Sequence, residues 1–241
     1  MKQKVRVLLC GDSAVTVEFG DAITDENNAR VTAFTREMNR LAIPGVEEII
    51  PTYRSATVFY NPCAVSLSQL EKMIRKAANK RAKGRSEKRR IFDIPVAYGS
   101  EFGPDLQRVA DRAGIAPIEV VRRHVTREYR IYMLGFLPGF PYLSGMDPSI
   151  ETPRLETPRT VIPAGSVGIG GKQTGLYPME SPGGWNIIGR TPIAAYDPHR
   201  NPPVLYRTGD SIRFIPIVRA EYERIAREVA AGTYTITSRE V

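Results

Sequence analysis

The chain has 241 residues, 42% of them apolar and 25% charged, which is enough for one large domain or two small ones with their own cores. No apolar run approaches the ~20 residues of a membrane span, and Asp12 interrupts the N-terminal apolar run too early for a signal peptide. Two cysteines, Cys10 and Cys63, form neither a metal-ligand motif nor a disulfide framework, so we expect a reducing, cytoplasmic compartment and no metal site.

The net charge of +8 is concentrated in the tract 76–90, which carries +7 and leaves +1 for the rest of the chain. No aromatic residues are interleaved with these cations, so we interpret the tract as a solvated linker and expect no nucleic-acid binding. The sequence therefore predicts an N-terminal α/β domain over 1–86 and a second domain over 87–241.

The N-terminal domain is predicted to have the element order ββαββα. Thr24 is the expected N-cap of its first helix, in which Val31, Phe34 and Met38 form one apolar stripe. Ser66 or Ser68 caps the second helix. The order indicates an α+β fold with both helices on one face of a small antiparallel sheet. The expected strands are 4–10, 14–19, 46–53 and 56–60, and the first helix is 25–42.

The second domain is predicted to be mainly β. Pro104 and Asp105 signal a helix start, Gly114 its end, and Pro117 the start of another helix reaching about Arg123. Many short strands with frequent turn signals favour a closed or sandwich-like β-domain, followed by a helix over about 219–230. The expected strands are 91–98, 129–136, 186–189, 193–196, 204–206 and 211–217.

Residues 132–192 hold eleven of the twenty glycines and nine of the nineteen prolines, so tight turns and short extended pieces should replace long helices there. A disordered linker would lack the aromatic and branched residues found here, such as Phe136, Phe140 and Trp185. Rigid, irregular and partly apolar backbone is typical of a binding or catalytic surface.

The glycine-rich stretch within this region resembles a phosphate-binding loop, but its spacing fails. Ser166 stands where the first glycine should be, and Gln173 stands where Ser or Thr should ligate magnesium. The stretch is not a P-loop. The backbone amides of Gly168, Gly170 and Gly171 could still approach an anionic ligand as a loop of another geometry.

Histidine and arginine supply the remaining candidates for chemistry. His124, at the end of a helix beside the Gly/Pro-rich region, is a candidate for proton transfer, although a helix-terminal role is the default. His199 lies in a polar turn and is expected to be idle. Arg154 and Arg159 lie an odd number of residues apart in an extended segment, so at most one should enter a pocket and bind a carboxylate or phosphate.

Carboxylates and serines give weaker signals. The predicted position of Asp105 at a helix start accounts for that residue, and a turn accounts for Asp210. Glu180 fits either a functional site or a turn. No serine occupies a nucleophile elbow. Hydrolase chemistry of the classical serine type is therefore not indicated.

Several long blocks of this sequence resemble the family of 5-oxoprolinase B subunits, also called kinase-inhibitor KipI and allophanate hydrolase subunit 1. The resemblance covers nearly the whole chain. The most distinctive blocks are Ile50-Pro51-Thr52-Tyr53-Arg54-Ser55, Tyr132-Met133-Leu134-Gly135-Phe136-Leu137-Pro138-Gly139-Phe140-Pro141-Tyr142-Leu143 and Ser181-Pro182-Gly183-Gly184-Trp185-Asn186-Ile187-Ile188-Gly189-Arg190.

The resemblance implies that the second domain is a cyclophilin-like β-barrel. It also implies an ATP-dependent opening of 5-oxo-L-proline to L-glutamate, carried out in a heteromeric 5-oxoprolinase with a homologous C subunit and a further A subunit. Such a site needs a cation for the substrate carboxylate, groups around the phosphate and a proton shuttle. Here the candidate substrate-binding residues are Arg154, Gln173, Tyr177 and Glu180, and the candidate catalytic residue is His124.

Two alternatives remain open at this point. The KipI name implies a regulator that binds and inhibits a sensor histidine kinase, and the exposed basic tract could contact an acidic partner. The allophanate name implies a role in urea or allophanate metabolism, which would require bicarbonate and biotin. The density of small residues and specific polar groups favours the enzyme component.

Overall fold

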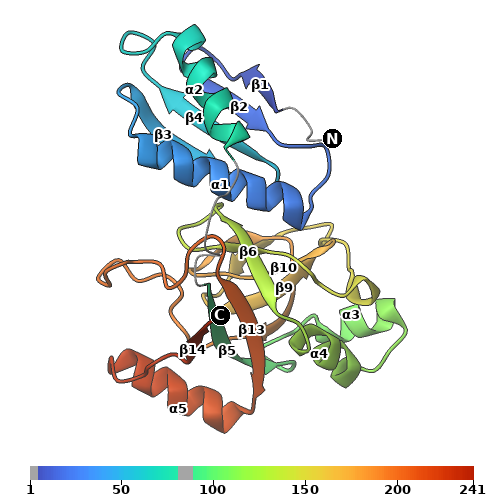
Figure 1. Ribbon diagram of the computed structural model, residues 1–241. Helices are drawn as coiled ribbons and strands as arrows, with labels where there is room; N and C mark the ends of the chain where they lie inside the picture. The colour runs from blue at the N-terminus through green and yellow to red at the C-terminus, as the bar shows by residue number, and fades with distance from the viewer. Residues whose placement is uncertain (1–4, 81–88) are drawn as a thin grey trace. The chain divides into compact units, whose positions relative to one another are not determined.

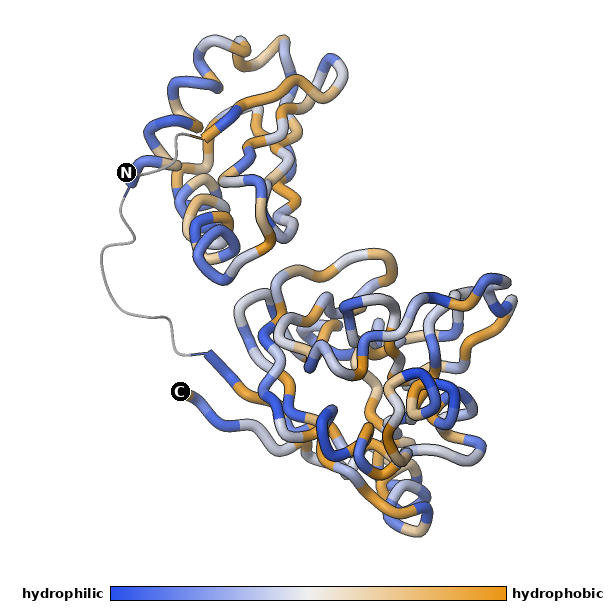
Figure 2. The backbone as a smooth tube through the Cα atoms, turned by 90° about the vertical axis from the view of Figure 1, so that its right-hand side faces the viewer, coloured by the Kyte–Doolittle hydropathy of each residue, from blue (hydrophilic) through white to orange (hydrophobic). Residues whose placement is uncertain are grey.

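The computed structural model describes residues 5–80 and 89–241 (Figure 1). These residues form two compact units, one within Met1–Ser86 and the other within Glu87–Val241. The centre of the basic tract, where a linker was predicted, lies outside the described residues. Figure 2 shows hydrophobic residues distributed through both units rather than gathered in one stretch. Of the helices in the described ranges, none has the length and apolar content to cross a membrane.

The first unit has the predicted ββαββα order. Its four-stranded antiparallel sheet has the strand order β1-β2-β4-β3. Alternate residues of β2 and β4, such as Val15, Val17 and Val58, share one buried cluster with both helices, so the helices cover one face of the sheet. The elements are β1 (Arg6–Leu9), β2 (Ala14–Glu18), α1 (Asp25–Leu41), β3 (Val46–Pro51), β4 (Ser55–Tyr60) and α2 (Leu67–Asn79).

Local capping explains where both helices begin. The Thr24 hydroxyl accepts a hydrogen bond from the Asn27 amide at 3.1 Å, which confirms the predicted N-cap of α1. The predicted apolar stripe of α1 is confirmed too, since Val31, Phe34 and Met38 are all buried. Of the two serines considered for α2, Ser66 is the cap, and it forms a reciprocal capping box with Gln69.

The second unit is built on an eight-stranded sheet that closes almost into a barrel, which confirms the expected fold class. The strand order is β10-β9-β12-β5-β13-β6-β7, with β14 also pairing β5. The end strands β7 and β10 lie next to each other, so little of the sheet is left open. The strands are β5 (Arg90–Tyr98), β6 (Tyr129–Leu134), β7 (Pro141–Leu143), β9 (Ser166–Gly170), β10 (Gln173–Leu176), β12 (Asn186–Arg190), β13 (Ser211–Ile217) and β14 (Ser238–Glu240).

Three helices and a small second sheet surround this barrel. The helix predicted over about 219–230 is confirmed, and Gly114 ends α3 in the left-handed region, as expected (φ 65°). The predicted helix start at Pro104 is wrong by two residues. The remaining elements are α3 (Leu106–Ala113), α4 (Pro117–Val125), the 3-10 helix η1 (Pro148–Ile150), β8 (Arg159–Ile162) paired with β11 (Ser181–Gly183), and α5 (Arg219–Ala230).

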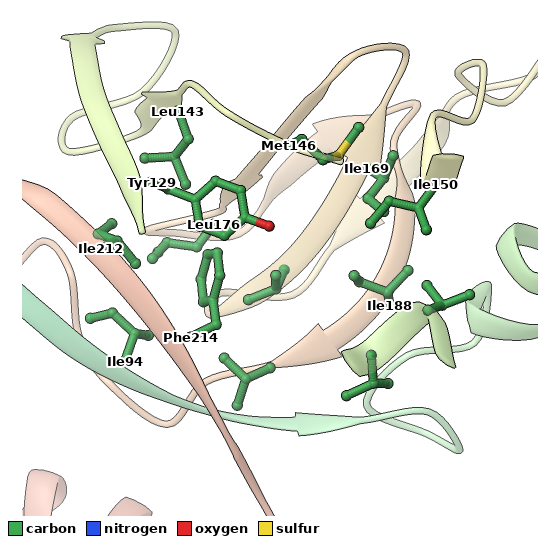
Figure 3. Close-up of a cluster of buried hydrophobic side chains, with 14 of the residues drawn as sticks. Ile94, Tyr129, Leu143, Met146, Ile150, Ile169, Leu176, Ile188, Ile212 and Phe214 are labelled. Atoms are coloured by element: carbon green, nitrogen blue, oxygen red, sulfur yellow. The ribbon is translucent and has the colours of Figure 1, made fainter. Parts of the chain in front are cut away.

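The barrel interior is a mainly apolar core. Figure 3 shows side chains from β5, β6, β9, β10, β12 and β13 meeting there, with Ile94, Tyr129, Ile169, Leu176 and Phe214 among them. Helices α3 and α4 contribute further buried residues to the same cluster. The predicted strands at 193–196 and 204–206 are wrong, because only an isolated bridge between Tyr196 and Val204 forms there.

Candidate functional site

The Gly/Pro-rich region folds around a second apolar cluster, separate from the barrel interior. Phe140 is its hub, and its ring centroid lies 5.2 to 5.5 Å from those of Phe136, Tyr142, Tyr177 and Trp185. We call these five residues the aromatic cluster. All four contacts with Phe140 are edge-to-face, the geometry that aromatic pairs prefer. The region is thus ordered around its own core.

Glycines are required where the backbone passes beneath these rings. A Cβ atom on Gly170 would fall on the indole of Trp185, and one on Gly183 would lie 2.7 Å from the hydroxyl oxygen of Tyr177. Close backbone approach, rather than flexibility, therefore explains these two glycines.

Replacing Gly170 by alanine should displace the indole of Trp185 and lower the free energy of unfolding by roughly 1–3 kcal/mol, the usual cost of overpacking. Trp185 is the single tryptophan of the chain, so its fluorescence emission reports the displacement directly. Gly184→Ala is a matched control, because the nearest atom to its Cβ, apart from its two chain neighbours, would lie 3.6 Å away, an ordinary contact. Equal emission spectra for the two variants would contradict the proposed packing.

Two arginines lie close enough to Tyr177 to act on its hydroxyl. Burial raises the pKa of Tyr177 to about 12, and the charges of Arg154 and Arg159 oppose that rise. The Arg159 guanidinium is paired with the Asp105 carboxylate at 2.7 Å. Arg154 is exposed, and within the described parts of the chain its guanidinium has no hydrogen bond or ion pair. Of the two, Arg154 is therefore the one available to an anionic ligand.

Asp105 has a structural role that the sequence did not reveal. Its side chain makes no capping bond to α3; instead, Oδ1 meets the Arg159 guanidinium and Oδ2 accepts the Ile187 amide at 2.6 Å. Asp105 does stand at the N-cap of α3, as its predicted place at a helix start requires, but that place does not explain its carboxylate. Its partners lie 54 and 82 residues away, so no local pattern could have identified them.

The backbone that carries Arg154 is fixed by Asn186. The side-chain amide of Asn186 donates to the carbonyl oxygens of Pro153 (2.9 Å) and Ile169 (3.0 Å), while its Oδ1 accepts from Arg108. On the other side of Arg154, the Leu155 amide donates to the Gly184 carbonyl at 2.7 Å. Arg154 is therefore presented from a rigid segment, which reduces the entropy lost on binding a ligand.

The predicted glycine loop is a β-hairpin, which corrects that expectation. Gly168 and Gly170 lie in β9, Gln173 begins β10, and Gly171 lies in the tight turn between them with φ 62°. Cross-strand pairing aligns β9 with β10, and the Gly171 amide donates to the Thr152 carbonyl at 2.7 Å. Paired amides do not form an anion cradle, so the hairpin does not fit a nucleotide phosphate.

His124 lies inside the barrel and not on its surface. It is fully buried, and its ring stacks on Phe214 with 4.7 Å between centroids. Nδ1 lies 2.8 Å from the Tyr98 hydroxyl and Nε2 lies 2.8 Å from Thr174 Oγ1. Because Thr174 donates its proton to the Gly168 carbonyl, it accepts from Nε2, and Nδ1 accepts from Tyr98.

This environment keeps His124 neutral, since burial lowers its pKa to about 3. In this conformation neither ring nitrogen can touch a ligand directly. His124 instead holds β5, α4 and β10 together through two side-chain hydrogen bonds, and Thr174 adjoins Gln173 in β10.

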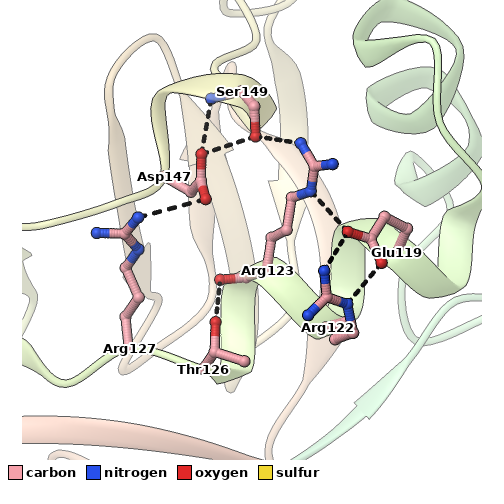
Figure 4. Close-up of polar contacts among 7 residues, drawn as sticks. All are labelled: Glu119, Arg122, Arg123, Thr126, Arg127, Asp147 and Ser149. Atoms are coloured by element: carbon pink, nitrogen blue, oxygen red, sulfur yellow. Dashed lines mark hydrogen bonds and ion pairs between the residues drawn. The ribbon is translucent and has the colours of Figure 1, made fainter.

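A surface network anchors the helix that carries His124. Figure 4 shows Glu119 of α4 bound by Arg122 and Arg123, and Arg123 reaching Ser149 of η1 at 2.6 Å. Hydrogen bonds from both arginines lower the pKa of Glu119 to about 2. The Ser149 hydroxyl in turn donates to Asp147. These contacts tie α4 to η1 and fix the helix in place.

The remaining candidates are dispersed. Glu180 is exposed next to β11 and has no hydrogen bond to the residues of the aromatic cluster, whereas Tyr177 is buried within that cluster. Among residues 5–80 and 89–241, no group of three or more His, Cys, Asp or Glu side chains could hold a metal ion. The structure thus brings Arg154 and Tyr177 together and leaves His124 and Glu180 apart from them.

Comparisons with known proteins agree with this architecture. The family model of the carboxyltransferase domain, subdomains C and D, matches residues 5–206. A 5-oxoprolinase B subunit from Bacillus subtilis (strain 168) is 42% identical, over 95% of this chain and 99% of its own. The crystal structure of TTHA0988 has a TM-score of 0.76 at 37% identity, covering 85% of this chain.

Some relatives are much longer. This chain spans 40% of the TTHA0988 chain. The urea amidolyase of Lachancea kluyveri is 24% identical over 100% of this chain, which corresponds to 15% of that protein.

Proposed function

Because the chain belongs to the carboxyltransferase-domain family and, within it, to the 5-oxoprolinase B subunits, we propose that it is the B subunit of an ATP-dependent 5-oxoprolinase. In this proposal it acts with the A and C subunits to open 5-oxo-L-proline to L-glutamate. The observation that carries the proposal is the 42% identity to a relative of that name over nearly the full length of both chains.

The reaction explains why such a site needs cations and ATP. A lactam carbon is a poor electrophile, so phosphorylation of the lactam oxygen by ATP makes it reactive. ADP leaves in this step. Water then adds to that carbon, and the C–N bond of the ring breaks as its nitrogen takes up a proton, which leaves an acyl phosphate. A second water hydrolyses the acyl phosphate to the carboxylate and phosphate. The substrate carboxylate needs a cation throughout, and developing negative charge needs fixed hydrogen-bond donors.

We assign the substrate carboxylate to Arg154, which can bind it bidentately from its rigid segment. The Tyr177 hydroxyl, with its pKa raised to about 12, stays protonated near neutral pH and can donate a hydrogen bond beside Arg154. His124 acts as a positioning residue: it holds Thr174, and thereby the strand that begins with Gln173. Since the hairpin does not fit a phosphate, we assign ATP to the assembled complex and not to these amides.

Arg154→Gln should raise the KM for 5-oxoproline by about 10- to 100-fold, because a hydrogen bond to a charged group contributes about 1.5–3 kcal/mol. The change in kcat should be smaller, because the carboxylate is held equally in the ground state and the transition state. Arg227→Gln is the matched control: Arg227 is an exposed arginine in the last turn of α5. Steady-state kinetics of the reconstituted enzyme give both constants, and an unchanged KM would remove Arg154 from the site.

A substrate comparison separates this proposal from urea chemistry, which the name of the Lachancea relative raises. The chain is mixed with its companion A and C subunits and given ATP with 5-oxoproline, or ATP with urea, bicarbonate and a biotin-carrying protein. We expect glutamate release in the first case and no urea-dependent ADP formation in the second. The reverse result would overturn the assignment.

A further inference from the structure

A cavity of about 600 Å³ lies on the second unit beside the start of β5. This volume is in the range of sites for small organic ligands. We call it the β5 pocket. The described residues that line it come from β5 (Arg90), from the loop before β13 (within 202–207) and from β14 (Glu240). None of them belongs to the aromatic cluster or to the segment of Arg154, so the pocket is separate from the candidate site above.

Part of the pocket lining is apolar. It is formed by Pro202, Pro203, Val204 and Tyr206. Tyr206 is buried, and its hydroxyl donates to the Gly139 carbonyl at 2.8 Å, so its polar group is already satisfied. This side of the pocket therefore offers a ligand apolar surface rather than hydrogen bonds.

The loop that forms this apolar wall is held from within by Arg200. Its guanidinium donates to four backbone carbonyl oxygens, those of Ala194 (3.0 Å), Ala195 (3.0 Å), Pro202 (3.3 Å) and Pro203 (2.9 Å). The wall is thus preformed, and a ligand would bind it without the cost of ordering a loop.

The pocket also has two arginines, both held by the buried carboxylate of Asp210. Oδ1 of Asp210 accepts the Arg90 amide at 3.0 Å. Oδ2 accepts Nη2 of Arg90 at 2.9 Å and the Arg207 amide at 3.1 Å. The Arg90 guanidinium lies over the Phe92 ring, 4.8 Å from its centroid. These contacts fix the backbone of both arginines and the side chain of Arg90 at the pocket.

Arg207 is the arginine with donors to spare. Its Nε lies 3.9 Å from Oδ1 of Asp210, beyond hydrogen-bond distance, and its side chain is 62% exposed. Within residues 5–80 and 89–241 its guanidinium makes no hydrogen bond. A guanidinium presents a planar fork of donors that matches a carboxylate. Glu240 is the one carboxylate among the described lining residues, and its charge would oppose an anion.

We propose that the β5 pocket binds a small organic anion, in which a carboxylate is attached to an apolar body. Arg207, assisted by Arg90, binds the carboxylate, and the apolar body packs against the wall of Pro203, Val204 and Tyr206. An inorganic anion would gain nothing from this wall, and an uncharged molecule would gain little from the two guanidinium groups. The site is independent of the proposed function, because it uses none of the residues assigned there.

Phenylacetate is a suitable probe, and its uncharged amide, phenylacetamide, is the matched control. The isotope-labelled full chain is titrated with each compound and followed by two-dimensional NMR. Phenylacetate should shift the backbone amide signals of Val204, Arg207 and Asp210. Phenylacetamide should bind about 10-fold more weakly or worse, because it cannot accept a charge-assisted hydrogen bond. Equal binding of the two compounds, or no shift at these three amides, would refute the site.

Variants of the two charged residues test the orientation of the ligand. Arg207→Gln should raise the Kd for phenylacetate about 10-fold or more, whereas Glu240→Gln should lower it about 2- to 5-fold by removing a like charge. Arg112→Gln, at an exposed arginine of α3, should leave the Kd unchanged. An unchanged Kd for Arg207→Gln would overturn the proposal. If that variant does not fold, an unchanged Kd for Glu240→Gln would overturn it instead.

Discussion

Replacing His124 by alanine should lower the free energy of unfolding by about 3–5 kcal/mol, the range for removing a large buried ring and orphaning a hydrogen-bonded partner. The ring is fully buried against Phe214, and its loss leaves the Tyr98 hydroxyl without its acceptor in the barrel interior. Denaturant unfolding at pH 7 measures the change. His199→Ala, at an exposed turn, should change stability by no more than about 0.5 kcal/mol.

His124 should also make the stability of the wild-type protein sensitive to acid. The pKa of His124 is about 3 in the folded protein, against 6.5 for an unperturbed histidine. Between these values the unfolded state binds the proton and the folded state does not, so stability falls as the pH drops from about 6.5 toward 3. His124→Gln removes this contribution. Its unfolding free energy should therefore fall less than that of the wild type between pH 7 and pH 5; parallel curves would show that the folded protein accepts the proton.

Asp105→Ala should lower the free energy of unfolding by about 2–3 kcal/mol, somewhat less than the loss of a fully buried ion-pair partner. The expected loss in free energy of unfolding is smaller because the Arg159 side chain is 34% exposed and can recover some hydration. The variant also leaves the Ile187 amide without its acceptor. Because Ile187 follows Trp185 and Asn186, we expect the emission of Trp185 to shift as this segment loosens.

A double-mutant cycle isolates the ion pair from the rest of the effect. Asp105→Asn, Arg159→Gln and the double variant are unfolded in denaturant under the same conditions. A direct pair gives a coupling energy of about 0.5–3 kcal/mol, whereas independent residues give additive changes. Asp111→Asn is the matched control, since Asp111 is exposed on α3 and bonds only to Gln107 among the side chains described. Additivity for Asp105 and Arg159 would contradict the pairing.

The first unit was predictable because its signals are local. The apolar stripe of α1 repeats at helical spacing, and Thr24 and Ser66 cap their own helices within three residues. Each of these signals lies within a few positions of the element that it defines. The α+β class and the ββαββα order followed from them.

Of the barrel strands within the Gly/Pro-rich region, β12 was predicted from the sequence, but β7, β9 and β10 were not. β9 is Ser166–Gly170, in which two of five residues are glycine, a composition that indicates a loop. Gly170 is needed because the Trp185 indole packs against it, and that contact joins residues 15 apart. Tertiary packing thus overrides local propensity here.

Only part of the candidate site could be predicted from the sequence. Arg154 was predicted as a site residue because its chemistry suits an anion, and the anchoring of its segment by Asn186 became clear only from the fold. The pairing of the Asp105 carboxylate with Arg159 and Ile187 was not predicted, because these partners are remote in sequence. The positive φ of Phe136 could not be predicted from its residue type, because phenylalanine normally avoids positive φ.

The most direct measurement is glutamate release from 5-oxo-L-proline by the purified components, with this chain present or omitted. We expect release only when this chain, the A and C subunits, and ATP are all present, with about one ADP formed per glutamate. Full ATP-dependent release in the absence of this chain, or none in the complete mixture, would contradict it.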